Sequence, residues 1–66
     1  MLNEIKNDIL RKQEKFYFDK RNEHYCKVRD YYDAHMFDEA YEELNKVYEY
    51  DRKWSKVTLE LIGADA

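Results

Sequence analysis

Residues with the chemistry of metal ligands or nucleophiles are few in this 66-residue chain. The soft metal ligands are His24, Cys26 and His35. His24 and Cys26 are two residues apart, so in a helix they point to different sides and suit no zinc site. Ser55 is the one serine, and His24 stands at the wrong helical offset to activate Cys26 as a nucleophile. The sequence therefore predicts a protein that is not an enzyme and that holds no metal or cofactor.

Carboxylates are plentiful, but paired acids gain a catalytic role only where a cleft raises the pKa of one of them, and a small helical unit offers little desolvation. Between residues 30 and 45 the chain has six acids, with neither Lys nor Arg, and tyrosines are interleaved with them. Such a segment would present carboxylates to a basic groove, with tyrosine as rigid contact area. The residues expected to bind a partner are Asp30, Tyr31, Asp33, Asp38, Glu39, Glu42 and Glu43.

Charge is divided unevenly between the two halves of the chain. Residues 1–29 hold eight Lys/Arg and five Asp/Glu, a net charge of +3, whereas residues 30–66 hold four and ten, a net charge of −6. The halves should attract each other, within one chain or between two chains packed head to tail. The basic stretch 11–21 also contains three aromatic residues, which offers stacking on single-stranded nucleic acid as an alternative. Direct nucleic-acid binding is disfavoured, because the whole chain is acidic.

The length limits the chain to one helical domain, residues 1–66, and a chain of this size buries only about 60% of its unfolded surface. Large aliphatic residues are few, and seven tyrosines carry much of the apolar surface. A core this thin predicts self-association or docking on a larger partner. One cysteine, no apolar leader and no apolar run of about 20 residues predict a reducing, cytoplasmic setting away from any membrane.

Helix is the expected state of most of the chain, which has no proline and a single glycine. Residues 2–34 carry two apolar stripes at helical spacing: first Leu2, Ile5, Ile9 and Phe16, then Tyr25, Val28 and Tyr32. At about 100° per residue the second stripe lies nearly opposite the first, and the segment 19–24 between them is wholly polar. We therefore expect a bend or break near residues 19–24, or two halves that pack against different neighbours.

The next boundary lies at residues 34–36, which interrupt the periodicity, and the two acids that follow suit a helix N-terminus. A helix is predicted over residues 37–53, with the apolar stripe Phe37, Ala40, Tyr41, Leu44, Val47 and Tyr48. Residues 55–62 alternate as a strand would, yet Gly63 suits a helix C-cap. Helix is favoured there, because a lone strand would lack a pairing partner.

The stretch YYDAHMFDEAYEELNKVYEYD, residues 31–51, resembles the turn and second helix of a tetratricopeptide repeat. The matching positions are Tyr32, Phe37, Glu39, Ala40, Lys46 and Asp51. His35 replaces the usual turn glycine, Val47 replaces a small residue, and no proline follows Asp51. A single repeat cannot close a solenoid, so the resemblance implies an antiparallel helical hairpin and nothing more.

These features predict an all-α fold, either a small antiparallel helical hairpin or a three-helix unit, that self-associates. The short chain, rich in Lys, Glu, Asn and Tyr, looks like the small accessory proteins of bacteriophages. That likeness implies a non-enzymatic inhibitor or modulator, which would present its acidic segment to a larger nucleic-acid-handling protein with a basic groove. The alternative is a self-associating structural protein without an inhibitory role.

Overall fold

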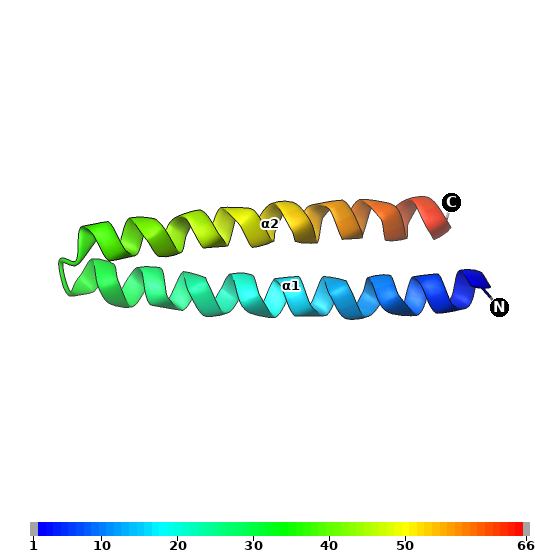
Figure 1. Cartoon of the computed structure of the whole chain (residues 1–66), viewed down its shortest axis with the longest axis horizontal. Helices are drawn as coiled ribbons and strands as arrows, with labels where there is room; N and C mark the ends of the chain where they lie inside the picture. The colour runs from blue at the N-terminus through cyan, green and yellow to red at the C-terminus, as the bar shows by residue number, and fades with distance from the viewer. Residues whose placement is uncertain (1, 66) are drawn as a thin grey trace.

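Two long antiparallel helices make up the described part of the chain, residues 2–65, in a computed structural model. Helix α1 spans Leu2–Asp33 and helix α2 spans Phe37–Asp65, and they pack along their length as a hairpin (Figure 1). Both termini lie at one end of a rod whose extents are 51 × 14 × 12 Å, and the turn lies at the other. The all-α prediction is confirmed in its hairpin form, and the three-helix alternative is wrong.

The conformation of the turn between the helices is determined by the hydrogen bonds that cap the C-terminal end of α1. The amide of Met36 donates to the carbonyl of Tyr31 at 2.8 Å, and the amide of His35 donates to that of Tyr32 at 3.0 Å. This pair of bonds is the Schellman motif, whose central residue adopts the left-handed conformation, and His35 does so with φ of 59°. The carbonyl of Met36 then accepts from Ala40, so α2 begins where the sequence predicted, at Phe37.

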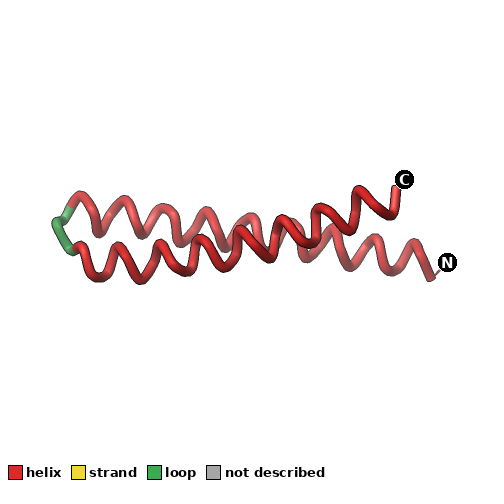
Figure 2. The backbone as a smooth tube through the Cα atoms, turned by 90° about the horizontal axis from the view of Figure 1, so that it is seen from above, coloured by secondary structure: helices red, strands yellow, loops and turns green. Residues whose placement is uncertain are grey.

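The contact between the helices is a seam whose least exposed residues recur at alternating spacings of three and four. On α1 the seam residues are Asn7, Leu10, Glu14, Tyr17, Arg21, His24, Val28 and Tyr31; on α2 they are Ala40, Glu43, Val47, Tyr50, Trp54, Val57 and Leu61. A repeat averaging 3.5 residues keeps one line of each helix on its neighbour, and the two helices cross at a shallow angle in Figure 2.

The seam holds little apolar material. Its buried hydrophobic residues are Leu10, Ala40, Val47 and Val57, and among the described residues no large side chain is buried completely. Polar side chains fill much of the rest and pair across the helices: Arg21 with Asp51 at 3.4 Å, His24 with Glu43, and Thr58 with Glu14. The hairpin is therefore held partly by polar pairs rather than by a continuous hydrophobic core.

The break expected near residues 19–24 is wrong, since α1 is continuous through that segment. The polar run looked like an interruption because it has no apolar residue to bury. Arg21 and His24 occupy the seam in it, and each finds a carboxylate on α2. Polar pairing thus carries the helix contact across the gap between the apolar stripes.

The apolar stripes themselves lie mostly outside the seam. The stripe of Leu2, Ile5, Ile9 and Phe16, which the sequence suggested as a buried face, is exposed along its whole length. In the later stripes Ala40 and Val47 are buried, Val28 and Leu44 are half-buried, and the aromatic members are exposed. Four of the eight seam positions in α1 hold polar residues, namely Asn7, Glu14, Arg21 and His24, so a search for apolar periodicity selected the wrong face.

The segment 55–62 belongs to α2, so the strand alternative is wrong and the second helix runs well past residue 53. Gly63 lies inside the helix rather than at its C-cap. The hairpin implied by the tetratricopeptide resemblance is confirmed, but helices of 32 and 29 residues are each about as long as a whole 34-residue repeat of that family. Across residues 2–65 neither helix combines the length and apolarity needed to cross a membrane.

Candidate partner-binding surface

The hairpin gathers the acidic segment at one end of the rod, because residues 30–33 close α1 and residues 38–42 open α2 (Figure 1). Five carboxylates there are exposed, and none of them forms an ion pair within residues 2–65. We call this set the acidic turn end: Asp30, Asp33, Asp38, Glu39 and Glu42. Six acids without Lys or Arg give residues 30–45 a net charge of −6, and the remainder of the chain carries +3.

The tyrosines of the same segment do not share this surface. At about 100° per residue, Glu42 lies about 100° around α2 from Tyr41, and Glu39 lies about 160° from it. Tyr31, expected to bind the partner, is half-buried in the seam. Glu39 and Glu42 thus lie on a different side of the hairpin from the exposed Tyr41, although they are interleaved with it in the sequence.

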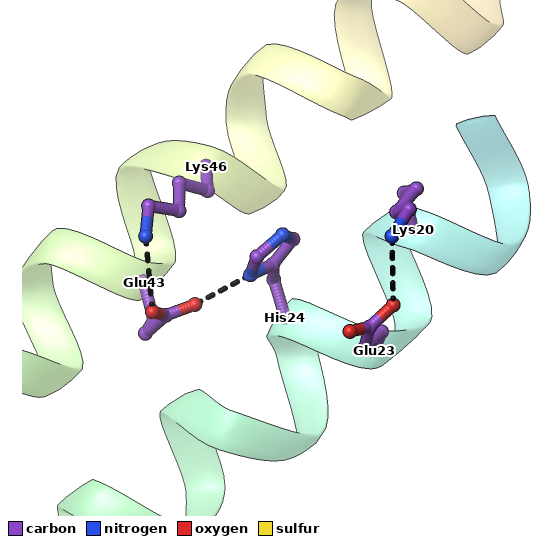
Figure 3. A network of polar contacts seen from close by, with 5 residues as sticks. All are labelled: Lys20, Glu23, His24, Glu43 and Lys46. Atoms are coloured by element: carbon purple, nitrogen blue, oxygen red, sulfur yellow. Dashed lines mark hydrogen bonds and ion pairs between the residues drawn. The ribbon is translucent and has the colours of Figure 1, made fainter.

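Glu43, the seventh residue expected to bind a partner, is buried, and the expectation that it stays solvated is wrong. Its carboxylate lies 2.5 Å from Nδ1 of His24 on α1 and accepts from Nζ of Lys46 at 3.2 Å (Figure 3). The ring of His24 also stacks on Tyr50, with centroids 5.5 Å apart. Glu43 therefore joins the two helices instead of facing a partner.

Burial alone would raise the pKa of Glu43, because it penalises the charged form. The hydrogen bonds from His24 and Lys46, with the positive charge of Lys46 beside them, outweigh that effect and hold the pKa of Glu43 below its ordinary value of 4.5. The carboxylate is thus anionic at neutral pH and stabilises the hairpin in that form.

Exposed aromatic residues form a second surface, beside the seam at the turn half of the rod. On α1 they recur every seven residues and so share one line; on α2 they follow at spacings of four and seven. Tyr32 contacts Phe37 edge to face at 5.9 Å, which joins the two lines across the turn. We call this set the aromatic face: Phe18, Tyr25, Tyr32, Phe37, Tyr41 and Tyr48, all 42–65% exposed. The stripe predicted from the sequence contained Tyr25 and Tyr32 together with Val28, but not Phe18, although Phe18, Tyr25 and Tyr32 recur every seven residues.

In the basic stretch 11–21, the rings of Phe16 and Tyr17 pack edge to face with centroids 5.6 Å apart, and Phe18 lies apart from this pair. Tyr17 is half-buried in the seam, where its ring lies 6.3 Å from that of Tyr50. Phe16 and Phe18 are two residues apart and so point about 160° away from each other around α1.

The surface hollows offer little enclosure for a small substrate. One hollow is lined by Asp51, Arg52, Ser55, Lys56, Leu59 and Glu60, all on α2, so a single helix surface forms it. Another is formed by Glu14, Lys15, Phe18 and Trp54, a shallow groove between the helices. Within residues 2–65 no three His, Cys, Asp or Glu side chains come together as metal ligands would.

Comparison with protein-family models, with curated proteins and with solved structures finds no match to this chain.

Proposed function

We propose that this protein is a non-enzymatic binding module whose acidic turn end occupies a basic surface on a larger protein, in the manner of a phage-type inhibitor of a nucleic-acid-handling protein. The observation that carries the proposal is the acidic turn end itself. Its five exposed carboxylates have no cation partner among the described residues, so their charge is available to another molecule.

The density of this charge is close to that of a nucleic acid. From Glu42 to the turn, the acidic turn end covers about 9 Å of the rod at a rise of about 1.5 Å per residue. Five charges over that length correspond to about one per 1.8 Å, against about one per 1.7 Å along duplex DNA. A groove that evolved to hold phosphates would meet a similar charge density on this hairpin. The rod is also narrow, 14 × 12 Å in section, which suits entry into a groove.

The test begins with capture of partners from a nuclease-treated lysate of the cells that make the protein, followed by their identification by mass spectrometry. The binding rate of the captured protein is then measured against three forms of the hairpin. The variant Asp30→Asn, Glu39→Gln and Glu42→Gln removes three charges on the side away from the aromatic face. We expect its association rate to fall by about tenfold or more at low salt, since rim charges act mainly on association.

A matched control changes Lys6, Lys12 and Lys56 to Gln, three exposed cations on the outer surfaces of the helices. This control should keep the association rate of the unmodified protein or raise it. Single-stranded or duplex DNA should also compete for the captured protein. Equal binding by both variants, or capture that DNA leaves unchanged, would contradict the proposal.

A self-associating structural protein is the second candidate, and one observation favours it. In the isolated hairpin, thirteen large hydrophobic side chains of the described part are exposed. A protein that works as a monomer has no need of so much exposed apolar surface. Self-association through the exposed aromatic residues would leave Asp30, Glu39 and Glu42 free for a partner, so one does not exclude the other.

A further inference from the structure

The isolated hairpin exposes more surface than a globular chain of its mass. Its accessible surface is 5468 Å² for 8.2 kDa. A compact monomer of that mass exposes about 4,500 Å², so the excess is about 900 Å². A standard protein interface removes about 800 Å² from each partner. The excess therefore equals what one ordinary interface would cover.

The aromatic face is the surface best suited to that role. Its six residues are about half exposed, and an aromatic side chain buries about 150–250 Å² when fully covered, so covering them removes roughly 600 Å². A patch of this size stands at the upper limit for soluble monomers. Tyr is also among the residues most enriched where interfaces gain their binding energy.

Charged residues along the borders of the aromatic face identify what covers it. On α1, Lys15 and Asp33 flank its two ends, and residue 24 is midway between them. A two-fold axis across α1 at this level would therefore place each of these residues beside an opposite charge on a second copy of α1.

Helix α2 repeats the arrangement independently. Asp38 and Arg52 lie beside the aromatic face, and the midpoint between them is residue 45. Residues 24 and 45 stand at one level of the hairpin, because His24 contacts Glu43 and, nearer the turn, Tyr32 contacts Phe37. One axis thus pairs opposite charges on both helices. Within residues 2–65 none of these four charged residues has an ion-pair partner in its own hairpin.

We propose that a second copy of this chain covers the aromatic face, forming an antiparallel four-helix dimer in which α1 stacks on α1 and α2 on α2. The two-fold axis crosses the rod near Tyr25, so the turn half of one hairpin lies on the turn half of its partner. The aromatic faces meet at the centre, and the border charges pair around them. An interface of this isologous kind is the commonest way for two identical chains to associate. It pairs Asp33 and Asp38 of the acidic turn end with the second copy and leaves Asp30, Glu39 and Glu42 uncovered, so it goes beyond the proposed function without depending on it.

Sedimentation equilibrium on the purified protein tests the proposal. We expect a mass twice the 8.2 kDa of the chain at micromolar concentration. The variant Tyr25→Gln, Tyr41→Gln and Tyr48→Gln removes aromatic area from both copies and should raise the dissociation constant by about 100-fold or more, with helicity by circular dichroism preserved. The matched control Leu2→Gln, Ile5→Gln and Ile9→Gln alters the exposed aliphatic stripe instead and should remain dimeric.

Charge exchange tests the antiparallel arrangement separately. Lys15→Glu alone and Asp33→Lys alone each place like charges together twice, and each should raise the dissociation constant by about fivefold at low salt. The double variant restores opposite charges and should return to the unmodified value. A monomer at all concentrations, dissociation caused by the Leu2, Ile5 and Ile9 control instead of the tyrosine variant, or additive single effects in the double variant would each overturn the proposal. These measurements involve no other protein, so their failure would not bear on the binding proposed for the acidic turn end.

Discussion

The buried pair of His24 and Glu43 should stabilise the hairpin less than a pair of leucines would. The two side chains are only 14% and 11% exposed, so both were taken out of water to meet. Such a pair is costly to break but often no better than apolar residues of similar size. Two changes separate these effects: Glu43→Gln, which breaks the pair, and the double change His24→Leu with Glu43→Leu, which replaces it.

The expected magnitudes follow from the two hydrogen bonds at Glu43. A bond to a charged group contributes about 1.5–3 kcal/mol and a neutral one about 0.5–1.5 kcal/mol. Gln keeps the shape but loses the charge at both bonds, to His24 and to Lys46, so the free energy of unfolding should fall by about 2 kcal/mol. The leucine pair loses both bonds but gains about 1.5–3 kcal/mol for each side chain buried in the seam. It should be at least as stable as the unmodified protein.

Urea unfolding followed by far-ultraviolet circular dichroism measures both variants at one fixed protein concentration, because association adds to the apparent stability. The dependence of the unfolding free energy on urea should stay constant, which would show that the same surface is exposed on unfolding. A Gln variant as stable as the unmodified protein would refute the argument that the pair is desolvated and intact. A leucine pair less stable by more than about 1 kcal/mol would refute the comparison with apolar packing.

Four further tests concern other features of the hairpin. Because folding lowers the pKa of Glu43 below its ordinary 4.5, the carboxylate contributes fully to the free energy of unfolding above pH 4.5. That contribution is lost as the pH falls through the lower pKa of the folded protein. Unfolding measured across this acid range should show the loss, and the Glu43→Gln variant should not. His35→Gly relieves a left-handed residue and should raise the free energy of unfolding by about 1 kcal/mol, whereas His35→Ala should not, as urea unfolding of both would show. Met36→Ser supplies the side-chain acceptor that the start of α2 lacks and should add about 1 kcal/mol, measured in the same way. Arg21→Gln should cost less than about 1 kcal/mol, because Arg21 and Asp51 are 35% and 48% exposed and water already screens them; a larger loss would show that the polar seam depends on that pair.

The helical content and the start of α2 were predictable because they depend on local properties of the chain. The absence of proline, the scarcity of glycine and the acids after residue 37 act within a few residues of where they stand. The turn at His35 was located for the same reason, since the periodicity changes there. Each of these signals is independent of what the helix packs against.

The buried face was not predictable from apolar periodicity, because the seam is a relation between two helices. Arg21 and His24 are poor candidates for burial until Asp51 and Glu43 are placed opposite them. The buried face is indicated by seam positions that are alternately three and four residues apart, whatever the polarity of the residues at those positions. For the same reason Glu43 was predicted on the partner-binding surface, whereas it lies buried in the seam.

The acidic segment shows how a linear pattern can mislead about a surface. Acids and tyrosines alternate between residues 30 and 42, and the sequence suggested one mixed face. The helical rotation of about 100° per residue instead places Tyr41 on the aromatic face and Glu39 on the far side of α2. Two functions, attraction of a basic partner and apolar contact, can then be carried by one segment without competing for the same area.

The distribution of polarity in the hairpin is the reverse of what a monomer should favour. Hydrophobic burial is proportional to the apolar area removed from water, so a chain gains most by covering its largest aromatic and aliphatic residues. Here Glu14, Arg21 and His24 occupy the seam while Tyr32, Tyr41 and eleven other large apolar residues stay exposed. The polar pairs fix which way the two helices face, and the aromatic residues are left for a contact outside the hairpin. In the proposed dimer the folding unit would be only part of the stable unit, and the rest of the apolar surface would be covered on association.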